Sequence, residues 1–335
     1  MGMRRSDEAK TNLAKIARIV FWCGAAICLG VLTRLNERAM AGPTRAQMTQ
    51  ENKEATICIG RFRFSVPGTV VVNGRSQSIY RVDVNAVSMP RGGIRELWGR
   101  EVARLEALGP TMETKTAIVR ELELESGVRA IWYADNPVSP QLHELVAMKP
   151  AGNYAIRAAR GGEASKHEVV ETLVRNVINA YTETGTRGFC VEEGAITSEP
   201  GLNEKALVSF AHRKLADFDI EFATITVSEP VPGLSEEDEK ETVESEGGSY
   251  TELRNQKRVA AGLEGKEMMT AVSLPREKPH VRFTWHFAGS PDSSGQPSVD
   301  FSATAPKEHR AELEKIWEMM LQSLRPVPAA TAPER

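Results

Sequence analysis

The sequence of 335 residues is poor in cysteine, in aromatic residues and in net charge, and these shortages exclude several classes of protein. Four cysteines are too few for a disulfide-dense scaffold or for a multi-cysteine zinc or iron–sulfur array. A net charge of -3 gives no overall basic footprint, which argues against nucleic-acid binding. Hydrophobic residues at 41% and charged residues at 26% lie in the ordinary globular range, so the chain is neither disordered nor a polytopic membrane protein.

The sequence also lacks the short motifs that mark common catalytic sites. It contains no GxGxxG or GxxxxGKS/T phosphate-binding loop, no GxSxG nucleophile elbow, no HExxH zinc motif and no SxxK pair. The histidines are scattered, and His280 and His286 fall on the polar face of one alternating strand, where solvated side chains are the simpler interpretation. We therefore predict a protein that is not an enzyme and holds no metal or cofactor.

An uncharged run near the N-terminus predicts the compartment. It covers residues 19–32 and reaches back to residue 16 if Arg18 is included. This length fits a signal-peptide core better than a membrane-spanning helix, which needs about 20 residues. Residues 39–41 (Ala-Met-Ala) supply a small-x-small cleavage site. We predict a bacterial-type periplasmic protein, either released by cleavage or tethered to the inner membrane through residues 16–32; the alternative is a buried helix of a cytosolic protein.

One order of predicted elements occurs twice along the rest of the chain. Each half reads β-β-α-β-β-β-β-α, and a polar linker at 182–187 separates the halves. Runs of strands without strict alternation with helices predict an α+β fold rather than a doubly wound one. We expect two similar domains, each an antiparallel sheet with helices packed on one face. The expected parts are a signal or anchor segment with a tether at 1–45, an N-terminal domain at 46–183, a C-terminal domain at 184–326 and a loose tail at 327–335.

Hydrophobic periodicity places the individual elements. The clearest strand is 280–288, in which Val281, Phe283 and Trp285 alternate with polar residues. The predicted strands are 57–66, 78–87, 114–124, 127–134, 141–149, 153–160, 205–212, 218–228, 250–259, 264–274, 280–288 and 297–303, and the predicted helices are 93–108, 165–181, 235–246 and 307–324.

The densest charge lies at 235–246 (SEEDEKETVESE). Ser235 suits the N-cap of a helix there, and acidic residues in the first turn complement the helix dipole. Two interpretations stay open: a solvated helix or mobile loop, or a docking surface for a basic patch on a partner, which would speed association. The candidate partner-facing residues are Glu236, Glu237, Asp238, Glu239 and Glu241.

Two cysteines, Cys58 and Cys190, remain after the leader. An oxidising compartment permits a disulfide between them. Two separate core cysteines are the alternative, and the residues alone do not decide between them.

Three short stretches resemble one protein family. Residues 58–67 (CIGRFRFSVP), together with 77–80 (QSIY), resemble the opening of the N-terminal domain of the type VI secretion immunity proteins that protect against the fourth class of lipase effectors. Residues 188–194 (GFCVEEG) resemble the opening of that family's C-terminal domain, and 321–326 (LQSLRP) its closing helix and tail. One departure is Glu193, where the family often has a glycine before Gly194.

The resemblance implies a two-domain, non-enzymatic inhibitor that binds a phospholipase effector and blocks its active site or lid. It implies no effector-contact residues, because the matched motifs are structural. We therefore predict a periplasmic immunity protein whose partner is a lipase toxin. An envelope module that binds a lipid or another ligand, without a toxin partner, is the main alternative, and an enzyme with an unrecognised site is the other.

Overall fold

The computed structural model describes residues 54–328 apart from 110–115, 126, 135–138, 140, 184–186, 193, 198–202 and 234. By its contacts the chain divides into residues 1–51 and one compact unit of residues 52–335. The predicted leader, its anchor and most of the tail lie outside the described residues, as does Glu193. Among the described residues, no helix is long and apolar enough to cross a membrane.

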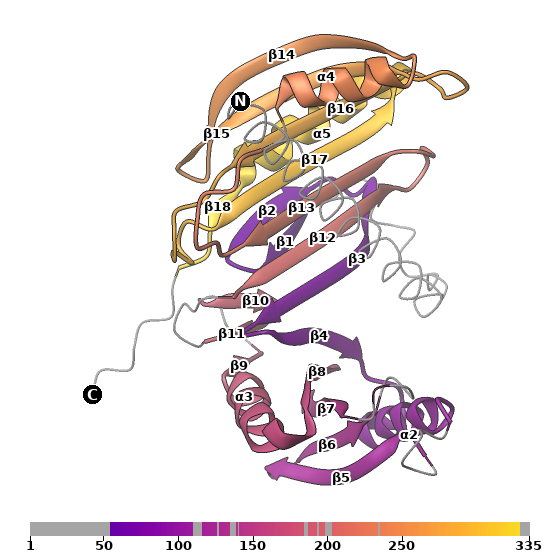
Figure 1. Cartoon of the computed structure of the whole chain (residues 1–335), viewed down its shortest axis with the longest axis vertical. Coiled ribbons are helices and arrows are strands. Elements are labelled where there is room, and N and C mark those ends of the chain that lie inside the picture. The colour runs from indigo at the N-terminus through magenta and orange to yellow at the C-terminus, as the bar shows by residue number, and fades with distance from the viewer. Residues whose placement is uncertain are drawn as a thin grey trace, which may run out of the picture. The chain divides into compact units, whose positions relative to one another are not determined.

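A twelve-stranded antiparallel sheet runs through the compact unit (Figure 1). Its strand order is β14-β15-β16-β17-β13-β12-β3-β4-β8-β7-β6-β5. The strands are β3 (Val70–Ile79), β4 (Val82–Ser88), β5 (Ile118–Glu125), β6 (Val128–Tyr133), β7 (Leu142–Ala151), β8 (Tyr154–Glu163), β12 (Lys205–His212), β13 (Asp219–Ile225), β14 (Ser249–Ala260), β15 (Leu263–Ser273), β16 (His280–Phe287) and β17 (Ser298–Pro306).

The sheet consists of two halves with the same strand order. The N-terminal half is β3-β4-β8-β7-β6-β5 and the C-terminal half is β12-β13-β17-β16-β15-β14. In each half a helix follows the second strand, α2 (Gly93–Glu106) or α4 (Glu236–Ser245), and another follows the last, α3 (His167–Asn179) or α5 (Arg310–Ser323). The predicted repeat of element order is therefore present. Because β3 and β12 pair antiparallel, an approximate twofold axis through this pair relates the halves.

The predicted α+β class is confirmed, but the expectation that the helices cover one face is wrong. Trp132 and Leu145 lie in the main core with α3, whereas their neighbours Ile131 and Val146 lie in a second core with α2. Successive side chains of a strand point to opposite faces, so α2 and α3 lie on opposite sides of the sheet. The strands between the two helices are apolar on both faces. In the sequence such strands are continuous apolar runs, and this pattern does not show that a helix covers each face.

The beginning of the chain joins the C-terminal half. The strand predicted at 57–66 is a hairpin of β1 (Ala55–Ile59) and β2 (Phe62–Val66), which turns at Gly60 with φ +57°. The hairpin packs against α5, and the ring of Phe64 lies 5.0 Å from that of Phe222, centroid to centroid. The strand β18 (Arg325–Pro326) pairs with β2. Another small sheet contains β9 (Tyr181–Thr182), β10 (Phe189–Val191) and β11 (Gly194–Ile196).

The strand predicted at 78–87 is also divided, into the end of β3 and the whole of β4. Since β3 pairs mainly with β12, a segment of the predicted N-terminal domain completes the sheet of the C-terminal half. The division into domains at residues 183 and 184 stays a prediction.

Candidate functional site

The two halves of the sheet meet where β3 pairs with β12, next to the turn that leads from β3 to β4. Strand β3 pairs with β12 from Val70 to Ser78, but with β4 only at Ser78 and Ile79. The turn between β3 and β4 contains just Tyr80 and Arg81. This turn therefore lies at the junction, beside strands of both halves.

Both turn residues have left-handed backbone conformations, with φ 54° at Tyr80 and 62° at Arg81. A two-residue turn of this kind usually contains Asn-Gly, because bulkier residues in this conformation cost about 1 kcal/mol or more each. The surroundings hold the turn in place. Tyr80 packs against the main core, and Arg160 of β8 donates a hydrogen bond to its carbonyl oxygen. The turn therefore presents Arg81 from a well-supported backbone.

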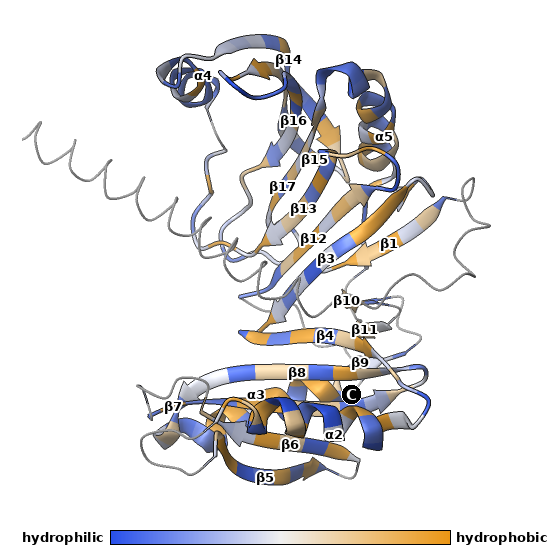
Figure 2. Ribbon diagram, turned by 90° about the vertical axis from the view of Figure 1, so that its right-hand side faces the viewer, coloured by the Kyte–Doolittle hydropathy of each residue, from blue (hydrophilic) through white to orange (hydrophobic). Residues whose placement is uncertain are grey.

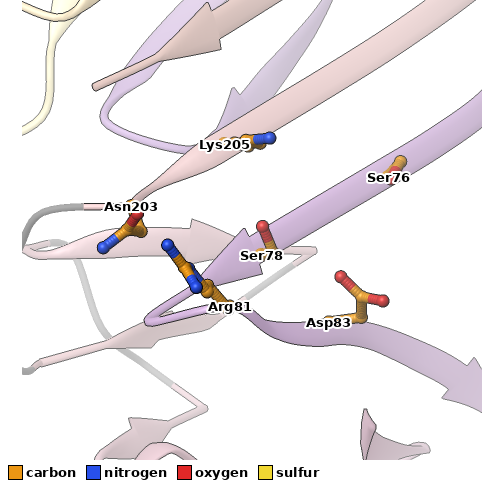
Figure 3. A pocket seen from close by; sticks show the side chains of 6 residues that line it. All are labelled: Ser76, Ser78, Arg81, Asp83, Asn203 and Lys205. Atoms are coloured by element: carbon orange, nitrogen blue, oxygen red, sulfur yellow. The ribbon is translucent and has the colours of Figure 1, made fainter. Parts of the chain in front are cut away.

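A polar hollow of about 470 Å³ lies beside this turn, and we name it the junction hollow (Figure 3). Its lining residues are Ser76, Ser78, Arg81, Asp83, Asn203 and Lys205. Three strands contribute because cross-strand partners share a face: Ser78 pairs with Lys205 on one side and with Asp83 on the other. The alternate residues Gln77 and Ile79 are buried, so the lining side chains point away from the main core.

Positive charge predominates in the junction hollow. Burial raises the pKa of the Asp83 carboxyl, while the charges of Arg157 and Lys205 lower it in part. Behind the turn, burial and the charge of Arg81 lower the pKa of Arg160, so the cations at this corner repel one another. Within the described part of the chain, neither Arg81 nor Lys205 forms an ion pair shorter than 4.0 Å.

The junction hollow belongs to a larger exposed sheet face, between α2 and α4. On the N-terminal side, Asp83 pairs with Ala159, which packs in the core of α2. On the C-terminal side, Asp219 pairs with Thr304, and Thr304 pairs in turn with Arg282 on the next strand. Arg282 forms an ion pair with α4. Both helices therefore lie on the same side of the sheet as the hollow. We name the strip between them, on β13, β12, β3 and β4, the central face; its exposed polar residues include Ser76, Asp83, Lys205, Asp219 and Glu221.

Acidic groups lie on the central face beyond β12. Glu221 on β13 pairs with Ser209 on β12. Burial and the nearby charge of Asp300 raise the pKa of Glu221. The central face is thus positive around the junction hollow and negative one strand away, a polarity that would orient a partner of complementary charge.

His286 on β16 is held by two acceptors, and the predicted solvated position is wrong. Its Nδ1 lies 2.7 Å from Asp300 Oδ1 and its Nε2 lies 2.7 Å from the carbonyl oxygen of Val231. Only the imidazolium form donates from both nitrogens. Burial lowers the pKa of His286, but the hydrogen bond and charge of Asp300 outweigh burial, and the pKa is raised. The His286 contacts tie the loop before α4 to the sheet.

The structure divides the five predicted acidic residues between the two sides of α4. Glu239 is buried against the sheet and forms an ion pair with Arg282 at 3.1 Å. Glu236 accepts a hydrogen bond of 2.8 Å from Asn255 Nδ2. These two acids hold α4 on the sheet. Glu239 is therefore unavailable to a partner, because its carboxylate is buried and already paired.

Helix α4 is hydrophilic along most of its length (Figure 2). Its N-cap is Ser235, as predicted, and the Ser235 hydroxyl accepts a hydrogen bond of 3.1 Å from the backbone of Asp238. Glu237, Asp238 and Glu241 are exposed, and we call them the outer acids. A role for them in binding a partner stays a prediction.

The structure brings Cys58 and Cys190 together, and their sulfurs form a disulfide with a Cα–Cα distance of 5.6 Å. This bond joins the β1–β2 hairpin to β10. Beside it, the guanidinium of Arg61 donates two hydrogen bonds, of 2.7 and 2.6 Å, to the carboxylate of Glu204. The hairpin is thus attached to the C-terminal half by a covalent bond and by a buried ion pair.

Sequence reasoning missed the junction hollow because it treated 78–87 as one alternating strand. That interpretation gave Arg81 no specific role. One signal was present: Ile79 and Val82 are both apolar at a spacing of three residues, which breaks the two-residue period of a strand. Lys205 and Asn203 could not be found in this way, because only the pairing of β3 with β12 brings them to the turn.

Comparison with known proteins identifies the family of the C-terminal half. Residues 185–329 match the family of Tle cognate immunity protein 4 C-terminal domains. No curated protein sequence matches the chain. The matched family consists of immunity proteins, and this confirms the prediction that the chain is not an enzyme.

Solved structures of similar fold cover about four fifths of the chain. A chain of the Tle4–Tli4 complex has a TM-score of 0.68 and 16% identity, over 82% of this chain and 98% of that one. The immunity protein TplEi of the type VI secretion system from Pseudomonas aeruginosa has a TM-score of 0.67 in its apo form, with 16% identity over 82% of this chain and 98% of TplEi. In complex with the "L" peptide the corresponding values are 0.63, 15%, 83% and 99%. Residues 185–329 are therefore similar to the Tle cognate immunity protein 4 C-terminal domains, and the chain shares the fold of the solved Tli4 and TplEi immunity proteins.

Proposed function

We propose that the protein is a periplasmic immunity protein that binds a cognate type VI secreted phospholipase effector and inhibits it by covering the active site or lid. The family match of residues 185–329 carries this proposal. The likeness to a chain solved in the Tle4–Tli4 complex supports a protein partner of the same kind. The disulfide between Cys58 and Cys190 agrees with an oxidising compartment such as the periplasm.

The central face is the surface that we assign to the effector. It lies between α2 and α4, so a partner seated on it would contact both halves of the protein. The pairing of β3 with β12 joins the two halves of this surface along most of both strands, whereas β3 is linked to β4 only at Ser78 and Ile79. Its separate positive and negative regions would fix the orientation of the effector.

Inhibition by occlusion requires tight binding, because a small free fraction of a catalytic toxin continues to turn over. A nanomolar dissociation constant corresponds to about -12 kcal/mol. Stable interfaces bury roughly 800 Å² on each partner. Contacts from α2, the central face and α4 together would supply a surface of this width.

The test is a titration of the purified protein into its cognate phospholipase effector, with phospholipid hydrolysis as the readout. We expect activity to fall linearly to zero at a molar ratio of about one. Bovine serum albumin at the same concentrations controls for non-specific effects on the lipid substrate. Full activity at a twofold excess of the protein, with no complex on gel filtration, would contradict the proposal.

Two hollows on the described surface favour a protein partner over the alternative of a lipid-binding envelope module. Ligand-binding cavities for lipids are lined mainly by apolar side chains. The junction hollow is polar, and a second hollow of about 480 Å³ is lined largely by charged residues, among them Asp217, Asp219, Glu277 and Lys278. The occlusion of a protein partner is therefore the function that the geometry supports best.

A further inference from the structure

We propose that the junction hollow binds a carboxylate side chain of the effector, with Arg81 and Lys205 as the groups that recognise it. This inference rests on the proposed function and specifies the chemistry of one contact.

The lining of the junction hollow suits a carboxylate. The guanidinium of Arg81 offers a planar pair of N–H donors that matches the two carboxylate oxygens. Lys205 adds a second positive charge from the neighbouring strand, and the Ser78 hydroxyl supplies a further donor (Figure 3). Asp83 is the one acid among the six lining residues, so two cations share a single negative charge.

Within the described residues these cations form no close ion pair, although the charge of Lys205 acts on the Asp83 carboxyl. By contrast, Arg157, farther along the same face, pairs with Glu101 at 3.4 Å. Burial and, to a smaller extent, the charge of Arg81 lower the pKa of Arg160. A carboxylate that enters the hollow would form charge-assisted hydrogen bonds with Arg81 and Lys205.

The backbone supports a built site. Tyr80, Arg81 and Asn203 all have left-handed conformations, with φ of 54°, 62° and 68°. Backbone strain of this kind persists where the surroundings enforce it and concentrates at functional positions. A turn selected only for stability would contain Asn-Gly. Here the second turn residue is an arginine, and the side chain of Arg160 donates a hydrogen bond to the carbonyl oxygen of Tyr80.

The position of the hollow makes it a strong candidate for an anchor. It lies between the parts of the sheet covered by α2 and α4, at the end of β3 and the start of β12. Residues at the centre of an interface lose the most water on binding and contribute most of the binding energy, and arginine is enriched among them. A carboxylate–arginine contact shielded from water at this point would dominate the dissociation rate.

The test compares two double variants for binding to a catalytically inactive form of the cognate effector. Arg81→Ala with Lys205→Ala removes both cations. Arg129→Ala with Lys307→Ala removes the same two residue types from exposed positions on β6 and in the short helix before α5, and serves as the matched control. We expect the first pair to weaken the dissociation constant at least about 30-fold and the control pair to change it less than about threefold.

A single variant separates binding from folding. Glycine adopts the left-handed conformation without strain, so Arg81→Gly should have a melting temperature no lower than that of the wild type. It should nevertheless bind the effector at least about tenfold more weakly. A variant as stable as the wild type with unchanged affinity would overturn the assignment of Arg81.

The outcomes distinguish a failure of the proposed function from a failure of the proposed carboxylate site. Wild-type protein that fails to bind the effector would overturn both the proposed function and this site. Tight binding by the Arg81→Ala/Lys205→Ala protein would overturn only the site. A phosphate group of a lipid has related chemistry, and vesicles of phosphatidylglycerol and phosphatidylcholine test it. Vesicle binding that this double variant loses, with effector binding intact, would assign the hollow to a lipid headgroup and overturn the proposal.

Discussion

Removal of Glu204 should destabilise the protein more than most single substitutions. The side chains of Arg61 and Glu204 are 7% and 4% exposed and are joined by two short hydrogen bonds. Replacement of Glu204 by alanine leaves the Arg61 charge buried without a counter-ion, and its Nη1 already has no partner among the described atoms. Breaking a buried pair in this way costs about 3–5 kcal/mol.

The measurement is urea unfolding followed by tryptophan fluorescence. With a denaturant slope of about 2–3 kcal/mol/M, the unfolding midpoint should fall by about 1–2 M. The double variant Arg61→Met/Glu204→Leu removes both charges and fills the space with apolar groups, so it should recover much of the loss. A Glu204→Ala midpoint within about 0.3 M of the wild type would refute the reasoning, because the pair would then contribute little to the attachment of the hairpin.

Three further predictions follow from the contacts described above. Replacement of Cys58 and Cys190 by serine should lower the free energy of unfolding by up to about 5 kcal/mol, since the bond closes a loop with a sequence separation of 132 residues; an unchanged urea midpoint would show that the unfolded chain gains nothing from the loss of the bond. The pKa of His286 is raised in the folded state, so the protonated side chain stabilises the fold at pH values below the unfolded pKa of about 6.5. This stabilisation should disappear as the pH rises through the folded pKa. Urea midpoints measured between about pH 5 and 9 should show the loss in the wild type and not in His286→Ala. Replacement of the outer acids of α4 by their amides should slow association with the effector severalfold at low salt and leave dissociation nearly unchanged, as stopped-flow mixing would measure; equal rates for both proteins would exclude α4 from steering the encounter.

Local periodicity predicted the elements well. The strand expected at 205–212 has the observed bounds of β12, and the helix expected at 235–246 differs from α4 by one residue at each end. Both segments have clear local signals, alternation in the strand and a capping serine in the helix. Such signals depend only on neighbouring residues, so they can be recognised without knowledge of the tertiary structure.

What the sequence could not predict depends on long-range pairing. The hairpin at 55–66 shows apolar alternation, but nothing in it indicates that it packs on α5, at the other end of the chain. Continuous apolar strands such as β6 do not reveal that helices cover both of their faces. The junction hollow required both the turn at Tyr80 and the pairing of β12 with β3. The site was therefore missed for the same reason as the topology.

The central pair of β3 and β12 has a consequence for the history of the fold. Each half ends at this pair with a full-length strand whose outer hydrogen-bonding groups are satisfied only by the other half. A chain that carried one half alone would expose that strand as a sheet edge, and exposed edges recruit further strands. Two copies of such a chain could pair along it about the same twofold axis, as a symmetric dimer. Fusion of the two copies into one gene would then free each half to diverge, one toward an acidic helix and the other toward an arginine-bearing turn, while the edge stays permanently closed.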